Sequence, residues 1–373
     1  MTDKNDPKKN EKTQEEEIQE LAKGFSRRGF LASTIAGSAV AGGAIGLPLA
    51  LTSKDAQAKS KGNSPHVDPG KLDKYYGFWS GGQSGEIRVY GVPSMRELKR
   101  IPVCNFDCTS GYGITDRSKK MMGGYKAGDT HHVHLSYDKG TYDGKYVYVN
   151  DKLNARLARV RIDYLETDSI VDLPNCQGTH GIFPQRIRRK NKPYLVFCNS
   201  EFRTPMRNDG RGMDDVKNYG ALHTAVDGEK MKVLWQVSVS GNMDLCATDY
   251  EGKYSMATCY NSEEGVTLND MTKADQDWLV IFKTDSIEAA VKAGKTKKYG
   301  NKIPVVDGMK GGKGDGKHVI YIPVPKSPHG VNMDPTGKYA IVSGKLSPLC
   351  SVISMEKVEQ CFAGKIKPAD CIV

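Results

Sequence analysis

Histidine side chains in three parts of the sequence could bind a transition metal. His131, His132 and His134 lie within one short segment, whereas His180 and His329 are each followed by a glycine. Neutral imidazole is a good ligand for copper, zinc, iron and nickel, and a flanking glycine lets backbone and metal approach closely. We therefore interpret His180 and His329 as ligands rather than core histidines. The other histidines lack this context and are interpreted as surface or strand residues: His66, His223 and His318.

The adjacent pair His131 and His132 would face opposite sides of a regular strand. Both can reach one metal site only if the chain forms a loop there, and the preceding Gly-Asp-Thr at 128–130 favours a loop. His134 is the same-face neighbour of His132 on a strand, and we interpret it as a supporting residue rather than a ligand. Asp129 could accept a hydrogen bond from a ligand ring; an ordinary turn residue is the alternative.

Two kinds of short apolar segment recur along the chain and must position these residues. Residues 86–103 and 158–174 each read as two strands joined by a polar turn, and a Gly-Lys-Tyr strand occurs at 144–149, 252–257 and 337–342, with a looser copy at 192–197. Helical pattern is scarce, and 286–295 is the best short helix. This repetition predicts an all-β fold, a β-propeller; an all-β sandwich is the alternative.

The candidate site residues keep a similar place on this repeat. His132 precedes the lysine of the next Gly-Lys-Tyr-type strand by 13 residues, and His180 precedes its lysine by 12. His329 and Asp244 each precede theirs by 9 residues. Equivalent positions of successive propeller blades point at one central axis. We therefore expect the imidazoles to converge on a metal site, with Asp244 accepting a hydrogen bond from a ligand ring or holding a water.

An acidic segment at 260–277 contains a second set of candidate ligands. Carboxylates and carbonyl oxygens within a short loop suit calcium. The spacing is not that of an EF-hand, and a solvated turn that leads into a strand is the alternative reading.

The first 58 residues have the layout of an export signal. Ser26-Arg-Arg-Gly-Phe-Leu31 is followed by an uncharged run rich in alanine and glycine at 32–52, and Ala56-Gln-Ala58 resembles a cleavage site. These parts in this order are typical of a twin-arginine signal, which predicts a periplasmic protein. A retained membrane anchor is the alternative, because the apolar run is long enough to span a bilayer.

Charge and cysteine content limit the remaining possibilities. The net charge of the 373 residues is +10, and the leader has eight basic and eight acidic residues, so the excess lies outside it. Lysine and arginine are scattered without interleaved aromatic residues, which argues against nucleic acid; an acidic electron-donor protein would suit the charge better. The nine cysteines include no C-x-x-C, and we expect mostly buried free thiols. Cys104 and Cys108 lack the following His or Met that a binuclear copper site would need.

Several motifs together resemble nitrous-oxide reductase. They are Asp-Thr-His-His-Val-His-Leu-Ser at 129–136, Gly-Thr-His-Gly at 178–181, Ser-Pro-His-Gly-Val-Asn-Met at 327–333, Gly-Lys-Leu-Ser-Pro at 344–348, Tyr-Tyr-Gly-Phe-Trp-Ser at 75–80, Pro-Ser-Met-Arg-Glu-Leu at 93–98 and Val-Ser-Gly-Asn-Met-Asp at 239–244. The similarity extends from about residue 71 to residue 373.

The resemblance implies a specific chemistry and a specific fold. The family reduces nitrous oxide to dinitrogen and water in the periplasm, with two electrons and two protons. Its N-terminal domain is a seven-bladed propeller that holds a four-copper sulfide cluster through seven histidines, four of which match His131, His132, His180 and His329. The resemblance also implies a homodimer and an electron donor such as a cytochrome c or a cupredoxin.

The resemblance also implies calcium near the cluster. The family's calcium ligands match Tyr260, Glu263, Met271, Asp277 and Ser327. The family usually has asparagine at the last of these positions, and the change matters little if the ligand is a backbone carbonyl. Asp129, His134 and Asp244 are then expected to support the copper ligands.

The sequence departs from the family after Val373. The family continues through further blades, which supply three more cluster histidines, into a cupredoxin domain with a binuclear copper centre. We therefore expect residues 59–373 to be part of the N-terminal propeller domain and this chain to be incomplete. The alternative function is an exported propeller without redox chemistry, lactonase-like or a binding module, with a single zinc or calcium ion.

Overall fold

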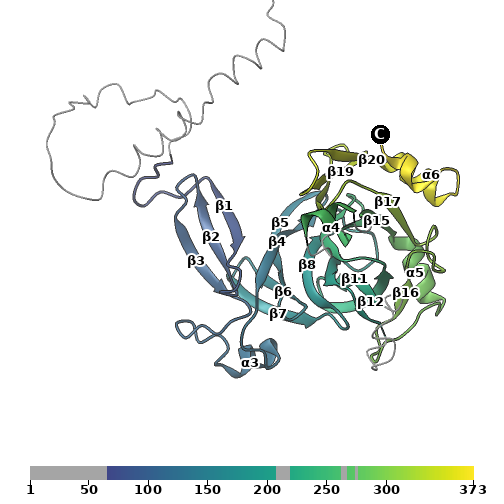
Figure 1. Cartoon of the computed structure of the whole chain (residues 1–373). Helices are drawn as coiled ribbons and strands as arrows, with labels where there is room; N and C mark the ends of the chain where they lie inside the picture. Colours follow the sequence, from purple (N-terminus) through teal and green to yellow (C-terminus); the bar gives the residue numbers. More distant parts are fainter. Residues whose placement is uncertain (1–64, 207–218, 262–266, 274–275) are drawn as a thin grey trace, which may run out of the picture. The chain divides into compact units, whose positions relative to one another are not determined.

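The computed structural model describes residues 65–206, 219–261, 267–273 and 276–373. The predicted leader, residues 1–58, lies outside these ranges. The described chain is mostly β-strand and forms five sheets that follow one another along the sequence (Figure 1). The predicted β-propeller class is confirmed.

The first two sheets are antiparallel meanders. The first contains β1 (Tyr75–Ser80), β2 (Glu86–Val92) and β3 (Glu97–Pro102), and the second contains β4 (Thr130–Asp138), β5 (Thr141–Asp151), β6 (Arg156–Arg161) and β7 (Glu166–Asp172). The hairpins predicted at 86–103 and 158–174 correspond to β2–β3 and β6–β7. Alternation of apolar and polar residues was therefore a sufficient signal for these pairs.

The third sheet is the largest. Its order is β8 (Gln177–Pro184), β9 (Leu195–Phe202), β11 (Tyr219–Asp227), β12 (Lys232–Val239) and β16 (Val305–Asp307), and β10 (Thr204–Pro205) pairs with β11. β16 is parallel to β12 and arrives from a distant part of the chain.

The last two sheets have related layouts. The fourth contains β13 (Met243–Thr248), β14 (Tyr254–Cys259), β15 (Trp278–Lys283) and β17 (Val319–Pro323); the fifth contains β18 (Pro328–Met333), β19 (Tyr339–Gly344) and β20 (Cys350–Ser354). In both, a helix follows the third strand directly: α5 (Thr284–Lys292) after β15 and α6 (Met355–Phe362) after β20. The predicted helix at 286–295 is α5, displaced by two to three residues.

The remaining helices are short. They are α3 (Asp116–Met122), α4 (Leu268–Lys273) and the 3-10 helix η3 (Pro368–Cys371). α3 begins where the Thr115 hydroxyl accepts a hydrogen bond from the Ser118 amide, and it ends at Gly123, whose φ of 67° is easily adopted by glycine. Among the described residues, no helix is long and apolar enough to cross a membrane.

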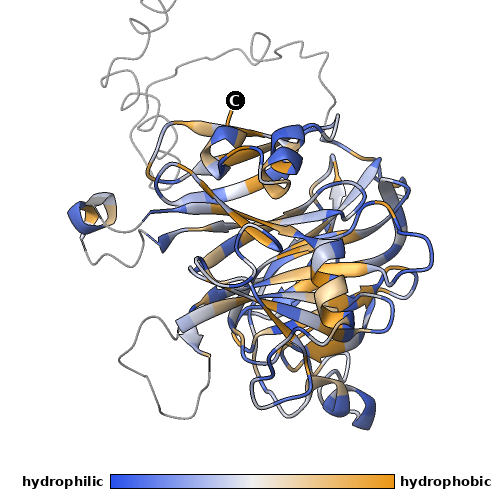
Figure 2. Ribbon diagram, turned by 90° about the vertical axis from the view of Figure 1, so that its right-hand side faces the viewer, coloured by the Kyte–Doolittle hydropathy of each residue, from blue (hydrophilic) through white to orange (hydrophobic). Residues whose placement is uncertain are grey.

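The hydrophobic core lies between consecutive sheets. Four clusters of buried side chains fill the spaces between sheets one and two, two and three, three and four, and four and five. Figure 2 shows the result as hydrophobic strands beneath largely hydrophilic loops. Each fully buried Phe or Ile, such as Phe282 or Ile320, contributes about 1.5–3 kcal/mol to folding. Face-to-face packing of successive sheets is what a propeller requires.

The Gly-Lys-Tyr segments occupy equivalent places. They form or precede β5, β14 and β19, and the looser copy precedes β9, so each is the second strand of its sheet. The first strands β4, β8, β13 and β18 contact one another in succession. The repeat read from the sequence therefore reflects the way each sheet is built, and it places the first strands next to one another.

Each of these first strands has a β-bulge near its start. In β4, Thr130 pairs with Asp151 and Val133 with Val149, so one extra residue is inserted. The same shift occurs between Thr179 and Ile182 in β8, between Met243 and Cys246 in β13, and between Pro328 and Val331 in β18. A bulge bends the strand and redirects side chains, and every predicted copper ligand lies within one of these four bulges.

The cysteines are unpaired, as expected from their sequence context. None of them forms a disulfide, and six are buried: Cys104, Cys198, Cys246, Cys259, Cys361 and Cys371. Burial raises the pKa of the Cys176 thiol, which lies beside Thr224, to about 12. These thiols behave as small apolar core residues.

Candidate metal centre

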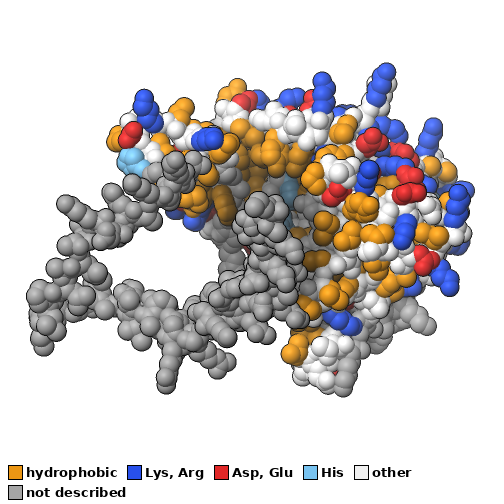
Figure 3. Space-filling view, turned by 90° about the horizontal axis from the view of Figure 1, so that it is seen from above, with side chains coloured by type: hydrophobic (Ala, Val, Ile, Leu, Met, Phe, Trp, Pro, Cys, Tyr) orange, Lys and Arg blue, Asp and Glu red, His pale blue; other side chains and the backbone are white. Residues whose placement is uncertain are grey.

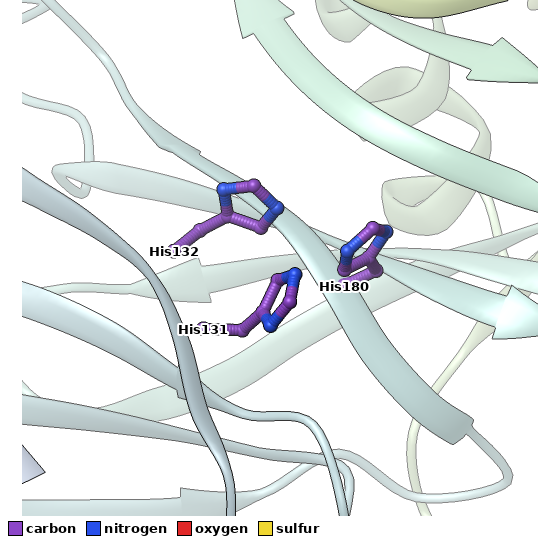
Figure 4. A group of neighbouring side chains, drawn as sticks. All are labelled: His131, His132 and His180. Atoms are coloured by element: carbon purple, nitrogen blue, oxygen red, sulfur yellow. The ribbon is translucent and has the colours of Figure 1, made fainter. Parts of the chain in front are cut away.

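Three of the predicted ligands come together in space. His131 and His132 lie on β4 and His180 lies on β8, and one ligand atom from each lies within 4.8 Å of the other two. The ring centroids are 4.6 Å apart for His131 and His180 and 4.8 Å for the other two pairs. Figure 4 shows the three rings directed toward one another. This separation matches imidazoles that share a metal ion or a compact cluster.

The bulge in β4 explains how two adjacent histidines reach one site. We expected a loop here, but β4 begins at Thr130 and both histidines lie inside the strand. Because the bulge inserts one residue opposite Asn150, the side chains of His131 and His132 need not alternate across the sheet. The prediction that the backbone forms a loop at His131 and His132 was therefore wrong.

The environment of the rings favours neutral imidazole, the form that binds metals. Burial, followed by the neighbouring rings of His180, His131 and His134, lowers the pKa of His132 to about 3. Burial, followed by the His180 ring and Lys152, also lowers the pKa of His131. Among the described residues, His132 Nε2 has no hydrogen-bond partner although it is buried. A buried nitrogen of this kind is costly unless something binds it, so these residues fit a metal.

Asp244 links two of the predicted ligands from the bulge of β13. Its Oδ1 contacts Nδ1 of His180, and its Oδ2 lies 2.5 Å from Nδ1 of His329 on β18. Burial would raise the pKa of Asp244, but the hydrogen bonds and charges of His180 and His329 outweigh it, and the pKa is lowered. A carboxylate that holds Nδ1 leaves Nε2 of each ring for a metal, which is a common arrangement at metal sites.

His329 differs from the three clustered histidines. Its side chain is 46% exposed, whereas that of His180 is 8% exposed, and it is joined to the cluster through Asp244. The structure therefore places all four predicted copper ligands around one carboxylate or beside one another. Like His131, His329 is exposed to solvent.

A chain of hydrogen bonds connects the four bulges. Asn150 lies opposite the bulge of β4, accepts a 2.5 Å hydrogen bond from the His132 amide and donates one of 2.5 Å to the Thr179 carbonyl of β8. Asn199 lies opposite the bulge of β8 and donates to the carbonyl of Leu245 at 3.1 Å. Each sheet therefore fixes the backbone of the next bulge.

Thr258 repeats this arrangement in the fourth sheet. It lies opposite the bulge of β13, accepts a hydrogen bond from the Leu245 amide and donates to the His329 carbonyl, both at 3.1 Å. We did not predict Asn150, Asn199 or Thr258 from the sequence. The available signal was a polar residue within an otherwise apolar second strand.

The other two predicted supporting residues lie elsewhere. His134 is packed against Phe183, with ring centroids 4.7 Å apart, and burial followed by the charge of Arg186 lowers its pKa to about 4. The Asp129 amide donates to Asp151 at 3.0 Å, and the Asp129 carbonyl accepts from Lys152 at 2.7 Å. Both residues adjoin the ligands in sequence, and their roles as supporting residues stay predictions.

The predicted calcium ligands lie at the start of β15 and around it. The Ser327 amide donates to Asp277 Oδ2 at 2.6 Å, and Ser327 has a positive φ of 53°. The Tyr260 hydroxyl donates to Glu201 at 3.1 Å, and Met271 lies in α4. Glu263 lies outside the described residues. A buried carboxylate such as Asp277 suits a hard cation, and all five predicted calcium ligands, Asp277 included, stay predictions.

Glu201 is a buried carboxylate that sequence reasoning missed. It lies at the end of β9, and its Oε1 is 3.0 Å from Nζ of Lys152. Lys152 follows Asn150, the residue opposite the bulge of β4, by two positions. Its charge acts to raise the pKa of His131, against the effect of burial. The segment Cys-Asn-Ser-Glu-Phe at 198–202 carries no motif that would have identified it.

Comparisons with known proteins give a consistent result. Residues 173–245 match the family model for nitrous oxide reductase propeller repeat 2. The nitrous-oxide reductase of Pseudomonas fluorescens is 48% identical over 326 residues, which cover 85% of this chain and 50% of that protein. That of Stutzerimonas stutzeri is 46% identical over 338 residues, covering 88% of this chain and 52% of that protein. The chain spans about half the length of the curated relatives it matches.

A solved structure is similar at a lower level. It is Kuenenia stuttgartiensis hydrazine synthase, with a TM-score of 0.48 and 14% identity, covering 79% of this chain and 66% of that chain. This likeness carries no argument about function.

The fold and site define a class of protein: a β-propeller whose successive sheets bring imidazoles together at one candidate metal site. Within that class, the chain resembles nitrous-oxide reductase over most of its length. The resemblance predicted from the motifs is therefore confirmed.

Proposed function

We propose that this chain provides the copper-cluster portion of a nitrous-oxide reductase, which reduces N2O to N2 and water with two electrons and two protons. The observation that carries this proposal is the convergence of His131, His132 and His180 in a chain up to 48% identical to such enzymes. Copper is the metal in this proposal because imidazole suits it and because the resemblance of the motifs to nitrous-oxide reductase implies it.

In this proposal four histidines hold the copper. His180 supplies a buried ring, His132 a partly buried ring, and His131 and His329 supply exposed rings. Copper in a cluster with sulfide would supply the two electrons and a positive site that polarises the N–O bond. The protein's own contribution is to hold neutral rings rigidly, and Asp244 fixes the orientation of two of them.

The location and partners are also part of the proposal. Residues 1–58 would direct export by the twin-arginine pathway, which places residues 59–373 in the periplasm. A cytochrome c or a cupredoxin would supply the electrons, and the functional form would be a homodimer. These statements rest on the resemblance.

A calcium ion beside the copper site is proposed on the same basis. Tyr260, Glu263, Met271, Asp277 and Ser327 would hold it. The contact between buried Asp277 and the Ser327 backbone supports this proposal, since it joins β15 to the segment that leads to His329. Calcium at this place would stabilise the start of β18.

The test is the metal content of the full chain, expressed with a copper supply and purified without chelators. The expected result is more than one copper per chain together with acid-labile sulfide, and calcium that is removed by a calcium chelator. One zinc per chain and no sulfide would instead support the alternative of an exported propeller without redox chemistry. N2O consumption with a reduced dye donor then tests the activity itself.

A further inference from the structure

The positive charge of this protein is concentrated in one segment. Residues 292–317 contain eight lysines and two aspartates, a net charge of +6, while the whole chain has +10. On the face seen in Figure 3, lysine and arginine side chains are spread among fewer acidic ones. Neither the fold nor the metal site accounts for this segment.

Part of this segment lines a cavity, which we call the lysine cavity. Its volume is about 530 Å³. The lining consists of residues 294–297, 305–307, 313–314, 317 and 318. Four of these residues are lysines: Lys295, Lys297, Lys313 and Lys317. Burial lowers the pKa of His318, and the nearby charges of Lys317 and Lys295 lower it further.

The lysine cavity is held by rigid parts of the fold. Val305 and Val306 of β16 and Val319 of β17 are buried in the core between the third and fourth sheets. His318 accepts or donates a 2.6 Å hydrogen bond with Ser286 of α5. The cavity is therefore a fixed concave surface that carries flexible charged side chains.

The lysines of the cavity lack the partners that other cations of this protein have. Three arginines elsewhere in the fold are paired with carboxylates at 2.6 to 2.8 Å: Arg156 with Asp151, Arg159 with Asp168, and Arg189 with Glu288. In the lysine cavity, Lys297 is 3.7 Å from Asp307. Within the described ranges no carboxylate pairs with Lys295, Lys313 or Lys317. Their charges are available to an outside ligand.

The chemistry of the lining selects among anionic ligands. The glycine-rich loop at 308–316 does not form a phosphate cradle, because the amides of 308–312 and 315–316 already donate to protein oxygens. No arginine is present for bidentate phosphate binding. Four of the eight lysines lie outside the cavity, so the charged surface is larger than a small molecule.

Two other large partners fit less well. Single-stranded nucleic acid binds through stacked aromatic rings, and the described lining contains none besides His318. An amphipathic contact with a lipid surface inserts exposed apolar side chains beside its basic residues, and residues 292–318 include no exposed large hydrophobic residue. A protein segment rich in carboxylates needs only complementary charge at flexible lysines.

We propose that the lysine cavity is a docking site for an acidic segment of a partner protein, in which glutamates or aspartates enter the cavity and pair with Lys295, Lys313 and Lys317. The outer lysines steer the approach and widen the contact. Its lining residues follow α5, form β16 and precede β17, and none of them belongs to the histidine-bearing bulges, so the site is independent of the proposed copper chemistry.

The probe for the test is a fluorescent hexaglutamate peptide, titrated with the full chain at low and at physiological salt. The test variant is Lys295→Gln/Lys313→Gln/Lys317→Gln. The control variant, Lys119→Gln/Lys120→Gln/Lys126→Gln, removes the same charge from exposed lysines in or near α3. Three lost ion pairs at exposed positions correspond to a Kd that is roughly tenfold weaker. The control variant should bind hexaglutamate as tightly as the unaltered chain does. Physiological salt should weaken the binding of hexaglutamate to both of these proteins.

Three results would overturn the proposal. One is an equal loss of binding in both variants, since net charge alone would then explain it. Another is no binding of hexaglutamate at low salt. The third result has two parts. Pyrophosphate, DNA or anionic vesicles would bind in a way that depends on the three lysines, and hexaglutamate would bind the unaltered chain no more tightly than the test variant.

Discussion

Strands β8 and β13 are neighbours with the same backbone and different side chains at the same point. Each starts with a bulge, at His180 in β8 and at Asp244 in β13. The imidazole of His180 points to the other rings, whereas the carboxylate of Asp244 holds His180 on one side and His329 on the other. The β-bulge therefore provides the same position in each strand. The residue type at that position would decide whether the side chain binds a metal or orients a ligand ring.

The largest effect on copper affinity is expected when one imidazole of the site is removed. In His180→Ala, only the His131 and His132 rings of the cluster remain and Asp244 loses one partner, so copper affinity should fall by more than about 100-fold, beyond the range for outer partners. Competition with a copper chelator measures this. His66→Ala, at an exposed histidine, is the control and should bind copper normally. Unchanged affinity of His180→Ala would contradict the assignment of the site.

Replacing the carboxylate should have the next largest effect. Asp244→Asn keeps the shape but cannot accept from both rings, so copper affinity should fall by about 10–100-fold while the ligands remain. The measurement is the same chelator competition, with the copper absorption spectrum as a second readout. An Asp163→Asn variant, at an exposed ion pair, controls for charge. A loss equal to that of His180→Ala would mean that Asp244 is itself a ligand.

A pair of glycine substitutions compares the bulges as backbone. A Cβ on Gly181 of β8 would lie 2.4 Å from the Asp244 carbonyl oxygen and 2.5 Å from the Cys246 nitrogen, whereas one on Gly330 of β18 would lie 2.8 Å from the Ser343 hydroxyl. Backbone cannot give way as a side chain can, so Gly181→Ala should lower the free energy of unfolding by about 1–3 kcal/mol, and Gly330→Ala by less. Urea denaturation measures both. Equal losses would show that close packing of β8 on β13 is not special.

The hydrogen-bond chain between the bulges can be broken at Asn199. Asn199→Ala leaves the buried Leu245 carbonyl and Nδ1 of His223 without this partner, which should cost about 1–3 kcal/mol of folding free energy. Copper affinity should fall less than in Asp244→Asn, because no ring loses a direct contact. A drop in stability without any change in the copper spectrum would mean that this chain of bonds does not position the ligands.

The last effect is a pH dependence at His223, which hydrogen-bonds to Asn199; it is absent near neutral pH and grows as the solution is acidified. Burial lowers the pKa of His223 to about 3, so the unfolded chain, with an ordinary pKa of about 6.5, binds more protons between these values. Stability from this group is therefore present above about pH 6.5 and is lost as pH falls toward 3, by up to about 1.4 kcal/mol per pH unit. In His223→Gln the acid sensitivity should be weaker. Identical pH profiles of unfolding would refute this role.

The sequence was informative about strands and about residue types, and less so about backbone irregularity. Alternating hairpins and Gly-Lys-Tyr strands predicted the second strands correctly, and counting residues back from them predicted that His132, His180 and His329 share a place in the fold. The bulges escaped prediction because a single inserted residue leaves no pattern in residue types. For this reason the adjacency of His131 and His132 was read as a loop.

Contacts between sheets were the second kind of feature that the sequence did not reveal. Asn150 and Thr258 act on carbonyls 29 and 71 residues further along the chain. Nothing in their local sequence distinguishes them from other polar residues of a strand. Only the packing of successive sheets gives them this role.

The four bulges also determine when a metal could bind during folding. Each sheet forms from strands that are close in sequence, but it contributes at most two of the side chains at the site. Closing the distance between His131 and His329 requires the loops of three further sheets to be ordered first, and such long-range closure comes late. Copper uptake would then follow the association of the sheets, and bound copper would report that the blades have assembled in the correct order.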